Sequence, residues 1–340
     1  MDESRADYSG AANLLLQARR VVLGGHPQMD GDALGSLLAL RAALIASGRE
    51  CIAVTQDNDA GKYGFLEGAD SLLPIQQVES LQGYDTCVMV DCGAESRARG
   101  ILQRLAPGTR VLNLDHHIDN PGFGDVAVVL PHASSSGEVV FHTLKQAGIP
   151  LNKAAAEALF VAIVTDTGRF MFSNSTPDAY RIVAQLVEDY ALEVSALTGH
   201  IYRSKSIERL KLESMVAGTL AVHMDGKLAV ATVTREMLET TGCNEADAAE
   251  MVTIPKSLRG SMVCILFRES APDDLKVSWR SEGQIAVNEI AALFNGGGHL
   301  RASGANVRGR PVQEAEREIV HATITALTAT LKQTGGAIIV

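Results

Sequence analysis

The chain has 340 residues, of which 46% are hydrophobic, enough to bury a large core and more typical of two domains than of one. Forty acidic residues against 30 basic ones give a formal net charge of −10, which disfavours a long basic track for a nucleic-acid backbone. A local basic pocket for a small anionic ligand is compatible with this charge, since bound divalent cations would offset part of it.

Five cysteines are spread along the chain without a CxxC pair or a regular spacing. This pattern argues against a disulfide framework and against a structural zinc site, and it favours a reducing compartment. The first ten residues are polar, and the apolar segments are too short or too interrupted to span a bilayer. We therefore expect a cytoplasmic protein without a signal peptide or a membrane partner.

Short apolar runs alternate with helical periodicity through the first half of the chain. Helices are predicted at 9–19, 37–47, from about 138 to 147, and at 153–164. Strands are predicted at 20–24, 51–54, 86–90, 109–114 and 126–130. Strands that alternate with helices favour a parallel sheet covered on both faces. We predict an α/β fold with an N-terminal doubly wound parallel-sheet domain over residues 1–190.

The second half has a different pattern, a charged helical stretch followed by several strands. A charged helical stretch over 177–212 is interpreted as a connector, with residues 191–214 as the helical linker. Beyond it, residues 215–340 should form a smaller mixed α/β domain that binds substrate. Its predicted strands are 220–223, 228–233, 261–267 and 275–280, and its predicted helices are 287–294 and 312–332.

Polar side chains that can bind metal follow the predicted elements of the first half. In a strand–turn–helix unit, ligands gather at the carboxyl end of the strand, so several strand ends can converge on one site. Helix capping is the alternative use of Asp30 and Asp32, but one cap needs only one carboxylate. An exposed acidic loop is the alternative for the group at Asp115. The candidates are His26, Asp30, Asp32, Asp91, Asp115, His116, His117 and Asp166.

The chemistry of this set points to divalent cations. Several carboxylates with two or three imidazoles suit two manganese or magnesium ions better than a thiol-rich zinc site. Two such ions ~3.5–4 Å apart can activate a water and stabilise the attacking and leaving oxygens of a phosphoryl displacement. Phosphoester hydrolysis is the reaction that these residues favour.

A glycine run in the second half suits an anion. Without side chains, Gly296, Gly297 and Gly298 let backbone N–H groups approach a ligand closely, although a flexible turn after a helix is the alternative. Nearby donors and charges are suited to a terminal phosphate: His299, Arg301, Ser303 and, on the preceding strand, Arg280. Arg268 is a further basic candidate, with a solvent-facing strand residue as its alternative interpretation.

Six motifs follow one another along the chain: HPQMDGDALGS, VDCG, LDHH and TDTGRF in the first half, then VSWRS and NGGGHLRASGA. With them the sequence resembles the DHH phosphoesterase family with a GGGH-type associated C-terminal domain, in the branch of nano-RNases and pAp phosphatases. The resemblance spans nearly the whole chain. Met29 stands where many relatives have proline, a change in the turn that leaves the expected ligands in place.

The resemblance implies roles for single residues. It implies that Asp91 bridges two manganese ions, with magnesium as the alternative metal. His117 would contact the scissile phosphate or protonate the leaving oxygen, and Asp115 would orient a histidine. The ligands of one ion would be His26, Asp30 and Asp91, and those of the other Asp32, Asp91, His116 and Asp166.

The resemblance also implies substrates. These are RNA or DNA oligonucleotides of two to five nucleotides, such as pGpG or pApA, together with pAp, and a homodimer is the expected assembly. One alternative is a phosphodiesterase for cyclic dinucleotides such as cyclic di-AMP. Another is a non-catalytic nucleotide- or RNA-binding module, but such a protein would be free to lose Asp91 or His116, and both are present.

Overall fold

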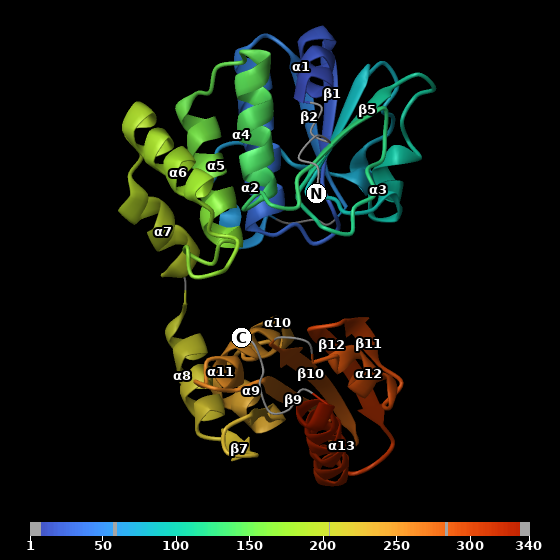
Figure 1. Cartoon of the computed structure of the whole chain (residues 1–340), viewed down its shortest axis with the longest axis vertical. Coiled ribbons are helices and arrows are strands. Elements are labelled where there is room, and N and C mark those ends of the chain that lie inside the picture. The colour runs from blue at the N-terminus through green and yellow to red at the C-terminus, as the bar shows by residue number, and fades with distance from the viewer. Residues whose placement is uncertain (1–7, 57–59, 204, 283–284, 334–340) are drawn as a thin grey trace. The chain divides into compact units, whose positions relative to one another are not determined.

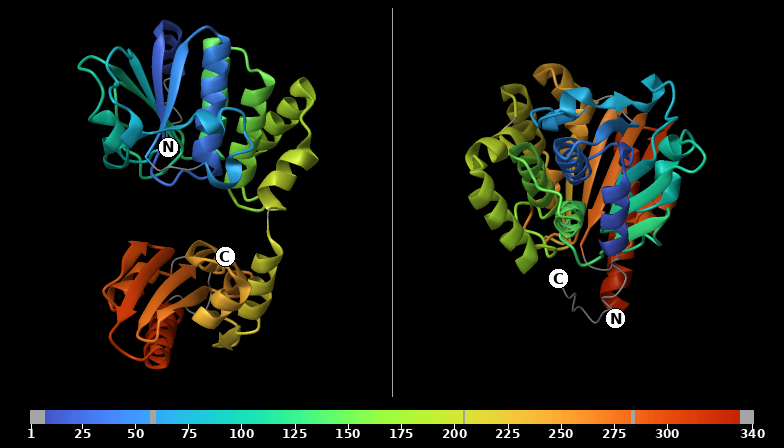
Figure 2. Two further views of the ribbon diagram at one scale, coloured as in Figure 1. Left: turned by 180° about the vertical axis from the view of Figure 1, so that it is seen from behind. Right: turned by 90° about the horizontal axis from the view of Figure 1, so that it is seen from above.

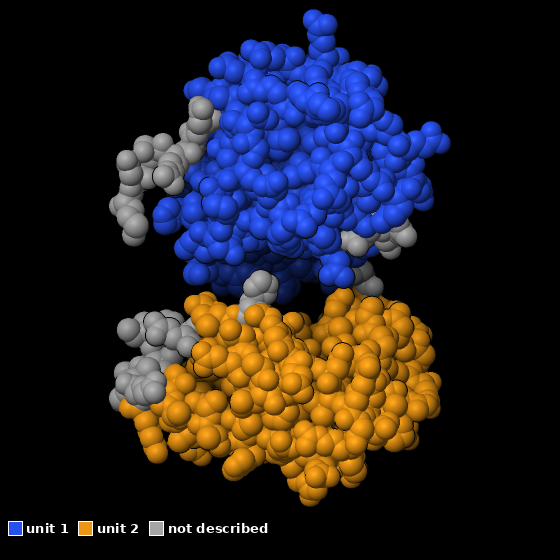
Figure 3. Space-filling view, turned by 90° about the vertical axis from the view of Figure 1, so that its right-hand side faces the viewer, with its two compact units in different colours: residues 1–204 blue, residues 205–340 orange. Residues whose placement is uncertain are grey.

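The computed structural model describes residues 8–56, 60–203, 205–282 and 285–333, apart from the side chains of His299 and Gln333 (Figure 1). The chain divides into two compact units, Met1–Ser204 and Lys205–Val340, coloured separately in Figure 3. Each unit has a sheet and hydrophobic clusters of its own. No helix within the described ranges is long and apolar enough to cross a membrane.

Unit 1 is built on a six-stranded sheet in which all neighbouring strands run parallel. The strand order reverses between β1 and β4, and this reversal is the point at which doubly wound sheets bind ligands. The predicted parallel sheet is therefore confirmed. In spatial order the strands are β3 (Leu73–Pro74), β2 (Glu50–Thr55), β1 (Arg20–Gly24), β4 (Thr86–Val90), β5 (Arg110–Asp115) and β6 (Val126–Val129).

Helices cover both faces of this sheet because its central strands are apolar on both sides. Leu23 and Val88 belong to the cluster under one layer of helices, whereas Val22 and Met89 belong to the cluster under α3. Helices α2, α4 and α5 stand side by side on the first face (Figures 1 and 2). The helices are α1 (Tyr8–Gln17), α2 (Gly31–Ala46), α3 (Glu95–Leu102), α4 (Ser136–Ala147), α5 (Lys153–Asp166), α6 (Pro177–Tyr190) and α7 (Val194–Tyr202), with 3₁₀ turns at Gly61–Tyr63, Ala69–Ser71 and Ile75–Gln77.

Unit 2 has a six-stranded mixed sheet in which β8 and β9 pair in parallel and the other neighbours pair antiparallel. The buried Trp279 packs with the cluster that includes α12 and α13 residues, and Cys264 with the cluster of α8 residues on the other face. In spatial order the strands are β11 (Gly297–His299), β12 (Ala302–Arg308), β10 (Asp274–Ser281), β9 (Val263–Ala271), β8 (Leu228–Val233) and β7 (Ala221–His223). The helices are α8 (Ile207–Ala217), α9 (Arg235–Thr241), α10 (Glu245–Glu250), α11 (Thr253–Lys256), α12 (Val287–Ala292) and α13 (Val312–Gln333).

Three sequence predictions need correction. The helix predicted to begin at residue 37 begins at Gly31, because the Asp30 carboxylate caps it. Two of the three glycines, Gly297 and Gly298, lie in a strand, because β11 pairs with β12, and neither strand is predicted from the sequence. The patterns also miss helices α9 to α11, which are short and carry little helical periodicity.

Candidate metal centre and substrate contacts

The metal-capable residues of unit 1 gather where the strand order reverses. His26 follows β1, Asp91 follows β4, and Asp115 is the last residue of β5. Two helices add the remaining carboxylates, since Asp32 lies in the first turn of α2 and Asp166 is the last residue of α5. The parallel strands end at one edge of the sheet, and α2 begins and α5 ends there, so residues up to 140 positions apart meet.

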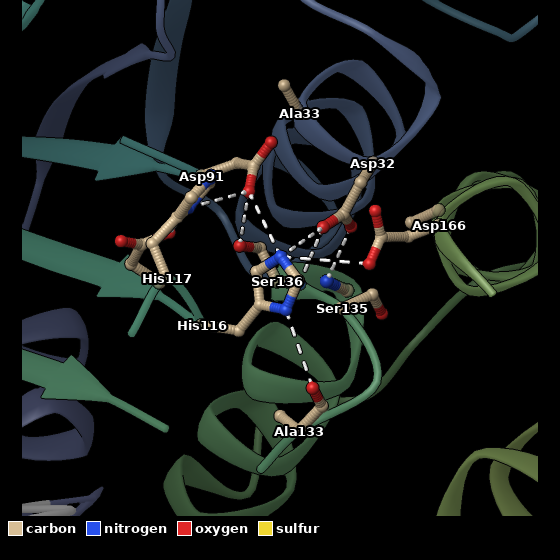
Figure 4. Close-up of polar contacts among 12 residues, drawn as sticks. Asp32, Ala33, Asp91, His116, His117, Ala133, Ser135, Ser136 and Asp166 are labelled. Carbon is tan, nitrogen blue, oxygen red and sulfur yellow. Dashed lines mark hydrogen bonds and ion pairs between the residues drawn. The ribbon is translucent and has the colours of Figure 1, made fainter. Parts of the chain in front are cut away.

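His116 lies at the centre of the first group of side chains (Figure 4). Its Nε2 is 3.7 Å from Asp32 Oδ2, 3.7 Å from Asp91 Oδ1 and 3.7 Å from Asp166 Oδ2. Ligand atoms that share one ion at metal–ligand distances near 2.1 Å lie roughly 3–3.5 Å apart, so these separations are close to those of a bound cation.

A second group shares Asp91. His26 Nε2 lies 3.4 Å from Asp91 Oδ2, and ligand atoms of His26, Asp30 and Asp91 lie within 4.8 Å of one another. Asp30 also caps α2 by accepting N–H bonds from Asp32 and Ala33, but both bonds go to Oδ1. The capping and metal-binding interpretations of Asp30 are therefore compatible.

Asp91 has an unusual backbone. Its φ of +50° lies in the left-handed region, where a residue with a side chain costs about 1–3 kcal/mol. The side chain is held by Ser136, whose hydroxyl donates a 2.8 Å hydrogen bond to Oδ1. Burial would raise the pKa of Asp91, but the contact with His26 and the charges of His116 and His117 lower it. The histidines thus favour the ionised carboxylate, which has Oδ2 toward His26 and Oδ1 toward His116.

Asp32 is held by the start of α4. The backbone N–H groups of Ser136 and Gly137 donate to its two oxygens at 2.7 and 2.9 Å, and the Ser36 hydroxyl donates at 3.2 Å. Burial and the charges of Asp91 and Asp166 raise the pKa of Asp32. Burial also raises the pKa of Asp166, to about 6, although the charge of His116 acts against it. Several carboxylates in one buried place repel one another, and a cation between them would relieve this repulsion.

The two histidine rings of these groups are oriented for metal binding. Nδ1 of His26 lies 2.6 Å from the Pro27 carbonyl oxygen, and Nδ1 of His116 lies 3.4 Å from that of Ala133. A ring that donates Nδ1–H to a carbonyl has its lone pair on Nε2, as in most metal-ligating histidines. In both residues Nε2 faces the carboxylates.

His117 has a different environment. Its Nδ1 lies 2.8 Å from Oδ1 of the fully buried Asp115, whose Oδ2 accepts a hydrogen bond from the Asn120 amide. The bond to Asp115 raises the pKa of His117 to about 9. The guanidinium of Arg97, which is exposed on α3, acts against this rise.

The residues of the site fit divalent cations that prefer oxygen and nitrogen ligands. Burial raises the pKa of the nearby Cys92 thiol to about 11, which disfavours a thiolate ligand.

The predicted phosphate residues of unit 2 lie on three adjacent strands or directly beside them, with Arg301 in the turn before β12 and Gly296 just before β11. Facing residues of antiparallel strands point to the same side of a sheet, and successive residues alternate. Ser303 pairs with Trp279 and is buried, so it points toward the core, whereas Arg280 pairs with Ala302 and points to the other face. Arg301 is exposed, and the side chain of His299 lies outside the described part. The structure therefore does not bring Ser303 and Arg280 together.

Arg268 lies on the Arg280 face of the sheet. It is half-buried, its NH2 group lies 3.5 Å from the Ser278 hydroxyl, and burial together with the charge of Arg280 lowers its pKa. It lines a groove of about 330 Å³ with Gly296, Gly304 and the polar side chains of Asn295, Asn306 and Ser278. The glycine run thus borders a polar groove that is lined by the Arg268 guanidinium.

Comparisons with known proteins agree with this architecture. The family model described as DHH family, N-terminal domain, matches residues 20–163, and the DHHA1 domain model matches residues 225–329. The bifunctional oligoribonuclease and PAP phosphatase NrnA of Thermus thermophilus is 32% identical over 314 residues, covering 91% of this chain and 90% of the relative. The chain belongs to the DHH family.

Two further relatives of this DHH-family chain extend the comparison. The protein of the same printed name from Bacillus subtilis is 28% identical, covering 84% of this chain and 89% of the relative. The solved structure of an exopolyphosphatase-related protein from Bacteroides fragilis superposes with a TM-score of 0.84 at 25% identity, covering 97% of this chain and 98% of that one. Both unit folds therefore occur together in a known structure.

Several residues around the DHH-family site are not predicted from the sequence. Ser136 donates hydrogen bonds to Asp32 and Asp91, and Gly137 donates one to Asp32. The Asn174 amide donates a 3.0 Å hydrogen bond to Asp166 Oδ2. Asn120 holds Asp115. The SSSGE run at 134–138 is a visible signal for the first two, since small polar residues before a helix supply free N–H groups. Nothing local marks Asn120 or Asn174, which act only through tertiary contacts.

Proposed function

We propose that this DHH-family chain is a manganese-dependent phosphoesterase that hydrolyses oligonucleotides of a few residues to mononucleotides and dephosphorylates pAp. The observation that carries the proposal is the buried carboxylate of Asp91, whose two oxygens face two different groups of ligand atoms. Relatives with high coverage, whose printed name is bifunctional oligoribonuclease and PAP phosphatase, support the substrate class.

The proposed ligands follow the two groups. Asp91 would bridge, and Ser136 would hold it by the hydroxyl bond to Oδ1. Divalent ions bound there would supply an activated water and stabilise negative charge on the phosphoryl oxygens. One ion would be held by His26, Asp30 and Asp91, and the other by Asp32, Asp91, His116 and Asp166.

His117 is the proposed proton donor to the leaving oxygen. Asp115 accepts from Nδ1, which orients the ring and leaves Nε2 as the atom that can reach the substrate. Asp115 is in turn fixed by Asn120, so it acts as a positioning residue. Contact with the scissile phosphate is the second role that the same ring could take.

Unit 2 is the proposed site for the terminal phosphate of the substrate. Arg280, Arg301 and His299 would supply charge and donors, and backbone N–H groups of Gly297 and Gly298 would approach the anion. Gly296 would contribute only by lacking a side chain, because its N–H donates to the Ala291 carbonyl at 2.9 Å. Arg268 joins them on the face of Arg280. Ser303 points toward the core, so it would support the backbone of the glycine run from the core side of the sheet. Its hydroxyl would lie 3.0 Å from a Cβ added at Gly298.

A substrate panel tests the proposed function. Purified protein with manganese or magnesium is incubated with pAp, pGpG, pApA, cyclic di-AMP and a 5′-phosphorylated RNA of about two dozen nucleotides, long enough to use a backbone track. We expect the highest kcat/KM on the dinucleotides with manganese, and a low rate on the long RNA. Faster hydrolysis of cyclic di-AMP would favour the cyclic-dinucleotide alternative, and no hydrolysis of any substrate would favour a binding module. Sedimentation of the same sample checks the expected homodimer.

A further inference from the structure

A tight turn follows the proposed metal ligand Asp166. Gly168, Arg169 and Phe170 all have left-handed φ values, +55°, +62° and +61°. Left-handed backbone at two successive residues with side chains is strained, and such strain persists only where surrounding contacts enforce it. The turn is therefore built to hold a particular conformation next to the site.

Contacts on both sides enforce this conformation. The Arg169 guanidinium lies 4.7 Å from the centre of the Tyr202 ring, and Phe170 stacks on Tyr180 with 4.5 Å between ring centres. The backbone N–H of Phe172 donates to Thr167 O at 3.1 Å. The side chains of residues 169 and 170 are thus both occupied by aromatic rings of neighbouring helices.

The Phe172 ring is presented differently. It is 53% exposed, and it stacks on no ring within the described part of the chain. Its inner edge rests on Gly168, because a Cβ added there would lie 2.5 Å from two ring carbons. Two other exposed apolar side chains, Met171 and Ile118, also lie within five residues of a proposed ligand. One exposed apolar residue is ordinary, but this ring rests on Gly168, two residues after the proposed ligand Asp166, so it lies beside the site.

The segment that carries Phe172 begins next to Asp166 in the chain and is bonded back to it through Asn174. The Asn174 side-chain amide donates hydrogen bonds to Asp166 Oδ2 at 3.0 Å and to the Ser134 carbonyl at 2.8 Å. The Ser175 backbone N–H donates to the Phe172 carbonyl at 3.1 Å. A ligand whose phosphate lies at the carboxylates would therefore find the ring at a set place near it.

We propose that the Phe172 ring is a stacking platform for a nucleobase of the substrate. The inference rests on the proposed function, because a nucleotide brings a flat π-surface attached to the phosphate that the metal centre would hold. Stacking of a base on an aromatic side chain tolerates every base, so the platform suits an enzyme for mixed short oligonucleotides. Loss of such a stack weakens binding about 5- to 150-fold.

Binding of two ligands that differ only in the base tests the platform. Dissociation constants for AMP and ribose 5-phosphate are measured by calorimetry with wild type, Phe172→Ala and Phe172→Trp. We expect the preference for AMP to fall about 5- to 150-fold in Phe172→Ala and to be retained in Phe172→Trp. Leu16→Ala is the matched control, since Leu16 is 52% exposed on α1, which leads into the opposite end of β1.

Hydrolysis supplies the second readout. With pApA and its abasic 5′-phosphorylated counterpart, Phe172→Ala should raise KM for pApA far more than for the abasic diester. The platform is overturned if Phe172→Ala keeps the wild-type preference for AMP, or if it loses equal affinity for AMP and ribose 5-phosphate. Either result would overturn the platform even if the wild-type protein hydrolyses the dinucleotides. If wild type cleaves no phosphoester while the AMP preference still depends on Phe172, the proposed function is wrong and the platform stands.

Discussion

The two candidate sites of this protein are built in opposite ways. The residues of the unit 1 site are scattered from His26 to Asp166, yet they meet because parallel strands end at one edge of a sheet. Apart from Arg280, those of the unit 2 site are almost contiguous, from Gly296 to Ser303, yet strand alternation sends Ser303 to the core, and Arg301 is exposed in the turn before β12. Scattered residues that converge are thus stronger evidence for a site than a compact motif.

The partners of the charged groups show the same contrast. In unit 1 three carboxylates of the proposed site have dedicated donors: Ser136 for Asp91, the α4 N–H groups for Asp32, and Asn174 for Asp166. In unit 2, Arg280 bonds only to the Trp279 carbonyl among the described contacts, at 2.8 Å. Preorganised charge is typical of a reaction centre, and the half-buried Arg280 guanidinium lacks such a set of dedicated partners among the described contacts.

The largest expected effect is that of Asp91→Ala, which removes one proposed ligand from each ion at once. The folded variant should bind markedly less manganese and cleave dinucleotides at least ~10³-fold more slowly, the scale of losing a principal transition-state stabiliser. Metal content and initial rates measure this, with Asp70→Ala as a control at an exposed carboxylate of unit 1. Wild-type rates in a folded Asp91→Ala protein would falsify the bridging role.

His117→Ala should come next. Loss of a general acid lowers kcat about 10²- to 10³-fold, while the metal content stays at the wild-type level. Because ligand atoms of His117 also lie within 4.8 Å of those of Asp91 and His116, the metal measurement decides between two roles. A variant that loses manganese together with activity would reassign His117 as a ligand.

Arg280→Ala should act on binding. A charge-assisted contact to a terminal phosphate is worth about 1.5–3 kcal/mol, so KM for 5′-phosphorylated dinucleotides should rise roughly 10- to 150-fold at unchanged metal content. Ser303→Ala sharpens the comparison, since Ser303 points to the other face and should change KM less. If Arg280→Ala treated phosphorylated and unphosphorylated dinucleotides as wild type does, the assignment would be wrong.

The smallest expected effect is that of Ser136→Ala. It removes the hydroxyl bond to Asp91 but keeps the N–H bond to Asp32, so manganese affinity should fall about 10- to 100-fold, as for other residues that orient ligands. Ser135→Ala is the matched control, because Ser135 is equally buried but caps α4 by accepting from Glu138 N–H. Equal losses of metal affinity in the two variants would show that α4 stability, rather than the Asp91 bond, is responsible.

Much of the fold could be predicted because its signals are local. The strands β4 and β8 have their predicted bounds, since each is a continuous apolar run between polar residues. The start of α2 and the strands β11 and β12 could not be predicted in the same way. A cap at Asp30 overrode the apolar pattern, and the glycines acquire strand structure only by pairing with β12.

The sequence by itself determined which polar residues follow the strand ends, because alternating strands and helices dictate a parallel sheet and a parallel sheet dictates a common edge. Only the tertiary structure decided how they are used there. The left-handed backbone of Asp91, the bonds from Ser136 and the ring of Phe172 on Gly168 all depend on segments distant in sequence or on backbone strain. Packing between elements and strained turns set these contacts, and neither leaves a periodic mark in the chain.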